Sequence, residues 1–222
     1  MQLTTAVLTL RQLMLAVLLL GLGGMAHAKD YLIEMIVFEH VNKDNAIPGS
    51  LYYPKLSSSM SLTSERAQNA GFELITDGLS MAESADKIKS QSRYRMLKHF
   101  AWRQPGLERK EAKAVRINIG RATTMYLPQD LKPYKTFIPA SSQPQADRTR
   151  EIRTTAINGT IKVSLGRFLH MDVHMVFTDP ETGTSYGMSQ SRKMRSRELH
   201  YIDNQRFGIL TRILPIEGNA GS

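Results

Sequence analysis

Residues 161–177 read Ile-Lys-Val-Ser-Leu-Gly-Arg-Phe-Leu-His-Met-Asp-Val-His-Met-Val-Phe, and their alternation decides the fold class. Apolar side chains hold the odd positions except for Arg167, whereas most even positions are polar. A period of two residues is typical of a strand with one face in a core and the other in water. Gly166 allows a bend beside Arg167, so the stretch predicts one long strand or two strands around that glycine.

Turn signals on both sides predict further strands. Asn158-Gly159 predicts a hairpin turn before the alternating stretch. The Asp-Pro-Glu-Thr-Gly sequence at 179–183 predicts a hairpin loop, after which residues 186–201 return antiparallel to the stretch. Residues 203–205 turn again, and 208–214 form the last strand, which Pro215 stops.

The preceding half of the chain predicts shorter elements. Runs of apolar and β-branched residues predict strands at 31–38, 72–75, 94–102 and 115–119. Residues 62–70 predict a short helix that stops at Gly71. A second helix is predicted from Ser80 to about Ser92. Ser80 and Glu83 form its capping box, and Met81, Ala85 and Ile88 share one face.

Together these elements predict an α+β protein. The expected fold is a single domain over residues 29–222, built on an antiparallel sheet of about six strands with one or two helices. Residues 128–153 contain four prolines and a Ser-Ser-Gln run, which predicts an exposed loop within the domain.

Residues 1–28 have the composition of a secretory signal. Arg11 is their one charged residue, 13–22 are apolar apart from Gly21, and Ala26-His27-Ala28 fits a signal peptidase site. The sequence therefore predicts cleavage after Ala28 and a periplasmic protein. The alternative is an uncleaved anchor, although the apolar run has only about half the length of a membrane span. No further span is expected after cleavage.

The amino-acid composition excludes several classes of function. The absence of cysteine excludes disulfides, thiolate catalysis and Cys-ligated metals. The net charge of +9 lies almost wholly beyond residue 28. An exported basic protein meets little nucleic acid, so cell-wall polymers, anionic headgroups or an acidic protein are the expected partners. Simple solubility is the alternative explanation of the charge.

Sequence motifs for catalysis are not found. The chain has no P-loop, dinucleotide fingerprint, HExxH or GxSxG sequence, so neither an enzyme nor a cofactor is expected. His170, Asp172 and His174 share one face of the alternating stretch and are the best metal candidates. A straight strand does not make three ligands converge, which favours a solvated strand face over a metal site. A metal-dependent hydrolase remains the third functional hypothesis.

The densest basic segment is Arg192-Lys-Met-Arg195-Ser-Arg197. Together with Arg167 it could form a positive patch for an anionic ligand. Charges also protect sheet edges from unwanted pairing, and this interpretation remains open beside the first.

Four segments resemble the CsiV family of bacterial envelope proteins. They are Ile33-Glu-Met-Ile-Val-Phe-Glu39, Tyr94-Arg-Met-Leu-Lys-His-Phe-Ala-Trp-Arg-Gln-Pro-Gly106, Asn158-Gly-Thr-Ile-Lys-Val-Ser-Leu-Gly-Arg-Phe-Leu-His170 and Arg192-Lys-Met-Arg-Ser-Arg-Glu-Leu-His-Tyr-Ile-Asp203, with Phe207-Gly208 beyond. The resemblance implies a non-enzymatic, peptidoglycan-binding periplasmic protein. It also implies support of cell-wall synthesis beside a penicillin-binding synthase and its lipoprotein activator.

The resemblance supplies no ligand residues, so the site hypothesis comes from chemistry. Carboxylates of the peptide stems suit arginine, and glycan faces suit aromatic rings. The predicted ligand-binding residues are Arg167, His170, Arg192, Arg195, Arg197 and Tyr201. The alternative is an envelope adaptor that acts mainly through protein–protein contacts, with peptidoglycan binding incidental.

Overall fold

Two five-stranded sheets dominate the computed structural model, which describes residues 29–41, 51–52, 56–129, 137–138 and 149–216. The first sheet has the order β11 (Leu199–Asp203), β12 (Phe207–Ile216), β1 (Asp30–His40), β5 (Tyr94–Pro105), β4 (Glu73–Ile75). The second has the order β10 (Ser185–Met194), β9 (Leu169–Thr178), β8 (Thr149–Leu165), β6 (Ala114–Pro128), β3 (Ser59–Met60). Among the described strands only β3 and β6 pair in parallel, and β2 (Leu51–Tyr52) pairs with β7 (Phe137–Ile138).

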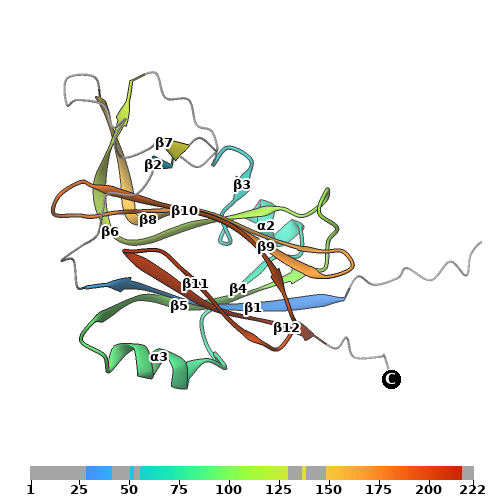
Figure 1. Ribbon diagram of the computed structural model, residues 1–222. Coiled ribbons are helices and arrows are strands. Elements are labelled where there is room, and N and C mark those ends of the chain that lie inside the picture. The colour runs from blue at the N-terminus through green and yellow to red at the C-terminus, as the bar shows by residue number, and fades with distance from the viewer. Residues whose placement is uncertain (1–28, 42–50, 53–55, 130–136, 139–148, 217–222) are drawn as a thin grey trace, which may run out of the picture.

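The main core lies between the two sheets (Figure 1). Ile33, Met35 and Val37 of β1 enter it together with the odd-numbered apolar residues of β8 and β9. Ile36 and Phe38 face the other side of the first sheet, where helix α3 (Ala82–Lys89) covers them. Strand β1 is therefore buried on both faces, which explains its almost unbroken apolar sequence.

The α+β class is confirmed, but the single sheet of about six strands is wrong. The alternating stretch forms two strands around Gly166, and its odd-numbered apolar residues are buried as predicted, Leu165 only partly. The face that carries the even-numbered residues is less exposed to solvent than predicted, because Ser164 and Asp172 are also buried. In a sandwich, the apolar faces of two sheets pack against each other in one core. The protein therefore has more strands than a single sheet of about six would contain.

The hairpin turn predicted at Asn158-Gly159 is wrong. Strand β8 passes straight through both residues and pairs with β6 on one side and β9 on the other. A Cβ at position 159 would meet the His174 carbonyl oxygen and, at 2.6 Å, the Met175 Cα. Glycine is therefore needed for the close approach of β9 rather than for a turn.

The single return strand predicted at 186–201 is also wrong. Strand β10 ends at Met194 in the second sheet, and β11 begins at Leu199 in the first. Arg197 lies between them with a φ of 69°, and its backbone N–H donates to the Ile213 carbonyl at 2.8 Å. The chain thus changes sheets at a sharp corner that alternation alone does not reveal.

Helix α2 (Glu65–Asn69) is shorter than predicted and begins at the Ser64 cap. Gly71 follows it with a φ of 77°, as its role as a stop signal requires. Helix α3 buries Ala85 and Ile88, and Met81 packs beside them, so the predicted apolar face is confirmed.

The capping box of α3 is wrong. Its cap is Met81, and Glu34 of β1 provides the capping carboxylate by accepting the Ser80 and Met81 backbone N–H groups, the latter at 2.7 Å. The Ser80 hydroxyl and His99 Nε2 also bond to Glu34, which is fully buried. A carboxylate from another element thus replaces Glu83, which pairs instead with Lys87 at 2.7 Å.

We expect Glu34 to make stability pH-dependent. Burial favours the neutral acid, but hydrogen bonds from Ser80, Met81 and His99 outweigh it and lower the pKa of Glu34 below its ordinary 4.5. Its contribution is therefore complete above pH 4.5 and is lost as the pH falls through the lowered pKa. Glu34→Gln should lower the free energy of unfolding at pH 7 by about 1–3 kcal/mol and flatten the acid limb in urea titrations.

Glu83→Gln is the matched control, because this glutamate lies on the exposed side of the same helix. It should leave the urea midpoint at pH 7 nearly unchanged, because an exposed ion pair within one helix contributes little to stability. An E34Q protein as stable as the parent at pH 7 would contradict the capping role.

Some predictions fall partly or wholly outside the described residues. These include the signal at 1–28 and most of the loop expected at 128–153, although β8 already begins at Thr149. None of the helices in the described part of the chain is long and apolar enough to cross a membrane.

Candidate functional site

The predicted basic residues gather at one end of the second sheet. Antiparallel pairing places Lys193 opposite His170 and Met194 opposite Leu169. The turn that follows β8 and the corner that follows β10 therefore lie side by side. We call this surface the basic end; its residues are Arg167, His170, Arg192, Lys193, Arg195 and Arg197.

Side chains at the basic end surround an exposed ring. The Lys193 Nζ lies 3.2 Å from the centroid of the Phe168 ring, and the Arg167 guanidinium lies 5.5 Å from it. Phe168 is 40% exposed, so this ring holds two cations near solvent. The basic end therefore combines positive charge with an aromatic face that the sequence analysis did not single out.

The remaining arginines lie on the edge strand β10 and just beyond its end. Arg192 faces the opposite side of β10 from Lys193 and donates to Gln190 Oε1 through Nε and Nη2, at 3.1 and 2.9 Å. Arg195 lies 3.4 Å from Glu198, with its side chain 77% exposed. Arg192 and Arg195 are both exposed, so this end presents positive charge to the solvent.

Tyr201 is not brought to the basic end. It lies on β11 opposite Leu210, on the face of the first sheet that α3 also covers, with its ring stacked 6.1 Å from Phe38. Burial, followed by its hydrogen bond to Asp203, raises the pKa of Tyr201, so the phenol is neutral at physiological pH. It is 47% exposed beside the exposed Leu199.

His170, Asp172 and His174 do not converge on a metal. His170 Nδ1 lies 3.1 Å from the Phe168 carbonyl, and His174 Nδ1 lies 2.8 Å from Ser189 Oγ. Asp172 accepts from the Ser191 hydroxyl at 2.6 Å. No group of three possible ligands forms among the residues that the structure describes.

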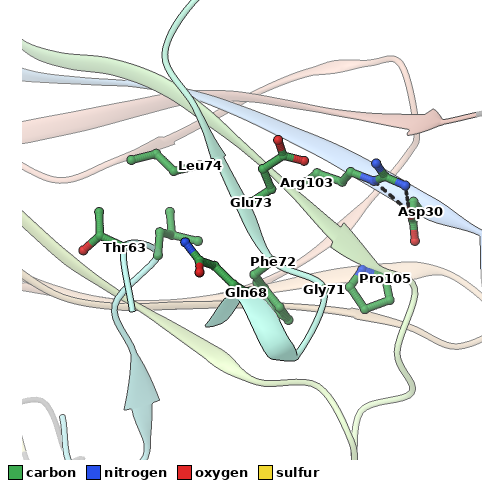
Figure 2. Close-up of a pocket in the computed structure, with 10 residues that line it drawn as sticks. Asp30, Thr63, Gln68, Gly71, Phe72, Glu73, Leu74, Arg103 and Pro105 are labelled. Carbon is green, nitrogen blue, oxygen red and sulfur yellow. Dashed lines mark hydrogen bonds and ion pairs between the residues drawn. The ribbon is translucent and has the colours of Figure 1, made fainter. Parts of the chain in front are cut away.

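A groove opens along the other edge of the sandwich, between β4 and α2. Its main hollow has a volume of about 640 Å³. We call it the edge groove. Its lining residues are Asp30, Leu62, Thr63, Gln68, Gly71, Phe72, Glu73, Leu74, Arg103 and Pro105 (Figure 2).

A second hollow of about 190 Å³ adjoins the main hollow of the edge groove, and Leu62, Thr63 and Leu74 line both. Lys98 and Asn118 are among the polar residues of this extension. Strands β4 and β6 run along its sides, and each is open to the groove over part of its length. The combined hollow suits an elongated ligand.

Sequence patterns could not reveal the edge groove. Asp30 and Arg103 are an ion pair at its rim, yet they lie far apart in the chain. Leu74 belongs to the three-residue strand β4, which begins directly after Phe72 and is too short for its periodicity to assign faces. The groove exists because the two sheets leave one side of the sandwich only partly filled by α2.

Comparison with known proteins identifies the family. No curated protein and no solved structure matches the chain. A family model described as "Peptidoglycan-binding protein, CsiV" matches residues 12–216, which is nearly the whole chain. The protein whose basic end and edge groove are described above therefore belongs to the CsiV family of peptidoglycan-binding proteins.

Proposed function

We propose that this chain is a non-enzymatic periplasmic protein that binds peptidoglycan through its basic end. The observation that carries the proposal is the gathering of Arg167, Arg192, Arg195 and Arg197 at one end of the second sheet. Family membership supports peptidoglycan as the ligand.

The chemistry of peptidoglycan fits this surface. Its peptide stems carry carboxylates, and arginine binds a carboxylate through two parallel hydrogen bonds. His170 and Lys193 lie beside the arginines and add donors. Binding led by such exposed charges weakens as the salt concentration rises, because the Debye length shortens.

Partners form the finer part of the proposal. Following the family resemblance, the protein supports cell-wall synthesis beside a penicillin-binding synthase and its lipoprotein activator. The second candidate function is an envelope adaptor, and the exposed Leu199 and Tyr201 on the first sheet favour it. Exposed apolar side chains that share one face of a sheet are typical of a surface that contacts protein.

Co-sedimentation with purified sacculi tests the proposed function. The triple variant Arg192→Ala, Arg195→Ala, Arg197→Ala should lower retention at low salt by about tenfold, because three charge-assisted contacts are lost. The measurement is the bound fraction of residues 29–222 across a salt series.

A variant of equal charge is the control. Lys87→Ala, Lys89→Ala and Arg121→Ala remove three exposed cations away from the basic end. Near-parental retention by this control, with loss in the arginine variant, would support the basic end. Equal losses in both variants would mean that net charge alone holds the protein, and the adaptor function would become the better explanation.

A further inference from the structure

The edge groove has polar side chains at its rim and apolar side chains on its floor. Phe72 and Leu62 are buried beneath it, and Pro105 lines one end (Figure 2). Gly71 adds no side chain, which leaves the space beside Pro105 open. Apolar floors of this kind accept the C–H faces of a sugar ring, and polar rims accept its hydroxyls.

Several rim groups have hydrogen-bonding capacity left for a ligand. Nε and Nη2 of Arg103 both donate to Asp30 Oδ2, at 2.8 and 2.5 Å. These bonds fix the pair and leave Asp30 Oδ1 and Arg103 Nη1 for a ligand. The side chains of Gln68 and Glu73 bond to nothing in the described part of the chain. Planar amide, carboxylate and guanidinium groups can each bond two neighbouring hydroxyls.

Charge separates the edge groove from the basic end. Asp30 and Arg103 neutralise each other, and Glu73 adds a negative charge to the main hollow. A ligand rich in carboxylates would be repelled by Glu73, whereas a neutral polyhydroxyl ligand would not. The main hollow is therefore suited to a saccharide rather than to an acidic peptide stem.

Backbone hydrogen bonds connect one end of the edge groove with the strand that precedes Arg167. The Gly106 N–H donates to the Lys29 carbonyl at 3.0 Å, and the Leu165 N–H donates to the Leu107 carbonyl at 2.8 Å. These bonds tie the Asp30–Pro105 end of the groove to the strand that leads into Arg167. A polymer with a neutral backbone and acidic branches could contact both surfaces at once.

We propose that the edge groove binds the glycan strand of peptidoglycan, a chain of N-acetylated amino sugars, while the basic end contacts the stem carboxylates. This assignment rests on the proposed function and names the part of the polymer that the groove recognises. Gln68, Glu73 and the Asp30–Arg103 pair bond hydroxyl and acetamido groups, and the floor contacts ring faces.

A fluorescently labelled chitooligosaccharide, which is a peptide-free glycan of N-acetylated amino sugars that carries no carboxylate, tests the assignment by anisotropy. The double variant Gln68→Ala, Glu73→Ala should weaken glycan binding by about tenfold. The double variant Glu65→Ala, Asn69→Ala is the matched control. Like the groove variant it removes one carboxylate and one amide, but both of its residues lie on α2 outside the groove lining. The control and the triple arginine variant should bind peptide-free glycan within about twofold of the parent.

Thr63→Trp provides a second test, since a bulky ring at the rim should block both hollows without altering the core. Thermal unfolding verifies that each variant is folded. Glycan binding that is undetectable, or equal in the parent, the groove double variant and T63W, would overturn the assignment. Competition for the groove by free stem peptide instead of glycan would also overturn it.

Failure of the assignment differs from failure of the proposed function. If intact sacculi retain the parent beyond a basic control protein but peptide-free glycan does not bind, the groove assignment is wrong and peptidoglycan binding stands. If sacculi retain the parent no better than the control protein, the proposed function itself fails.

Discussion

Replacing Arg206 with methionine will lower the free energy of unfolding by about 3–5 kcal/mol. Arg206 is 2% exposed, and its Nη2 lies 3.0 Å from Asp179 and 3.6 Å from Glu39. Its guanidinium also lies 5.2 and 5.0 Å from the ring centroids of Phe177 and Tyr186. Removing the cation leaves two buried carboxylates without their shared partner, and the cost of their desolvation is no longer offset.

Urea unfolding at pH 7 measures this loss. Arg195→Met is the matched control, because its side chain is 77% exposed and its pair with Glu198 is on the surface. The control should change stability by less than about 0.5 kcal/mol. Adding Asp179→Asn to R206M should restore part of the loss, since one of the two buried negative charges is removed. An R206M protein as stable as the control would show that the network contributes little.

The ion network joins the two sheets. Glu39 is the last residue but one of β1 in the first sheet, Asp179 follows β9 in the second, and Arg206 lies in the turn between β11 and β12. Arg95 provides a second partner for Glu39 from β5, with Nε at 2.9 Å. The network therefore fixes how the sheets meet at the end opposite the basic end, where apolar packing alone would permit sliding.

Gly159→Ala will destabilise the protein by about 3 kcal/mol or more. The added Cβ would meet the His174 carbonyl oxygen and the Met175 Cα, which are backbone atoms of the neighbouring strand. Strand β8 is held between β6 and β9, so it cannot move away without breaking pairs on its other side. Overpacking against backbone is costly because no side-chain rotation relieves it.

Gly166→Ala is the control for this substitution. A Cβ at position 166 would meet nothing within 4 Å, and the residue lies in the turn between β8 and β9. We expect a change within about 0.5 kcal/mol for G166A in the same urea titration. Similar losses in both variants would indicate a general intolerance of alanine in this hairpin and contradict the close-approach argument.

The alternation of apolar and polar residues over 161–177 predicts the strands of this region and which of their residues are buried. The spacing of Met81, Ala85 and Ile88 likewise predicted the buried face of α3. Both signals are local, because the period of a strand or a helix depends only on residues that are close in the sequence. The basic segment 192–197 was also visible in the sequence, and its meeting with Arg167 follows from the antiparallel return of β10.

The predictions from sequence were wrong where a residue distant in the chain determined the local structure. Asn158-Gly159 has the composition of a turn, but β9 requires a glycine in mid-strand. Ser80 and Glu83 have the spacing of a capping box, but Glu34 from β1 reaches the helix first. In both cases a contact that is remote in sequence supplied more stabilising energy than the local alternative.

The α+β class, most strand positions, the apolar faces and the basic segment can be predicted from the amino-acid sequence, because each depends on the order of adjacent side chains. Four features become visible only in the folded chain: the division into two sheets, the separation of Tyr201 from the arginines, the Glu39–Arg206–Asp179 network and the edge groove. These features depend on which strands pair and where two sheets fail to close. Such pairing is a global balance of burial and chain entropy that no single segment encodes.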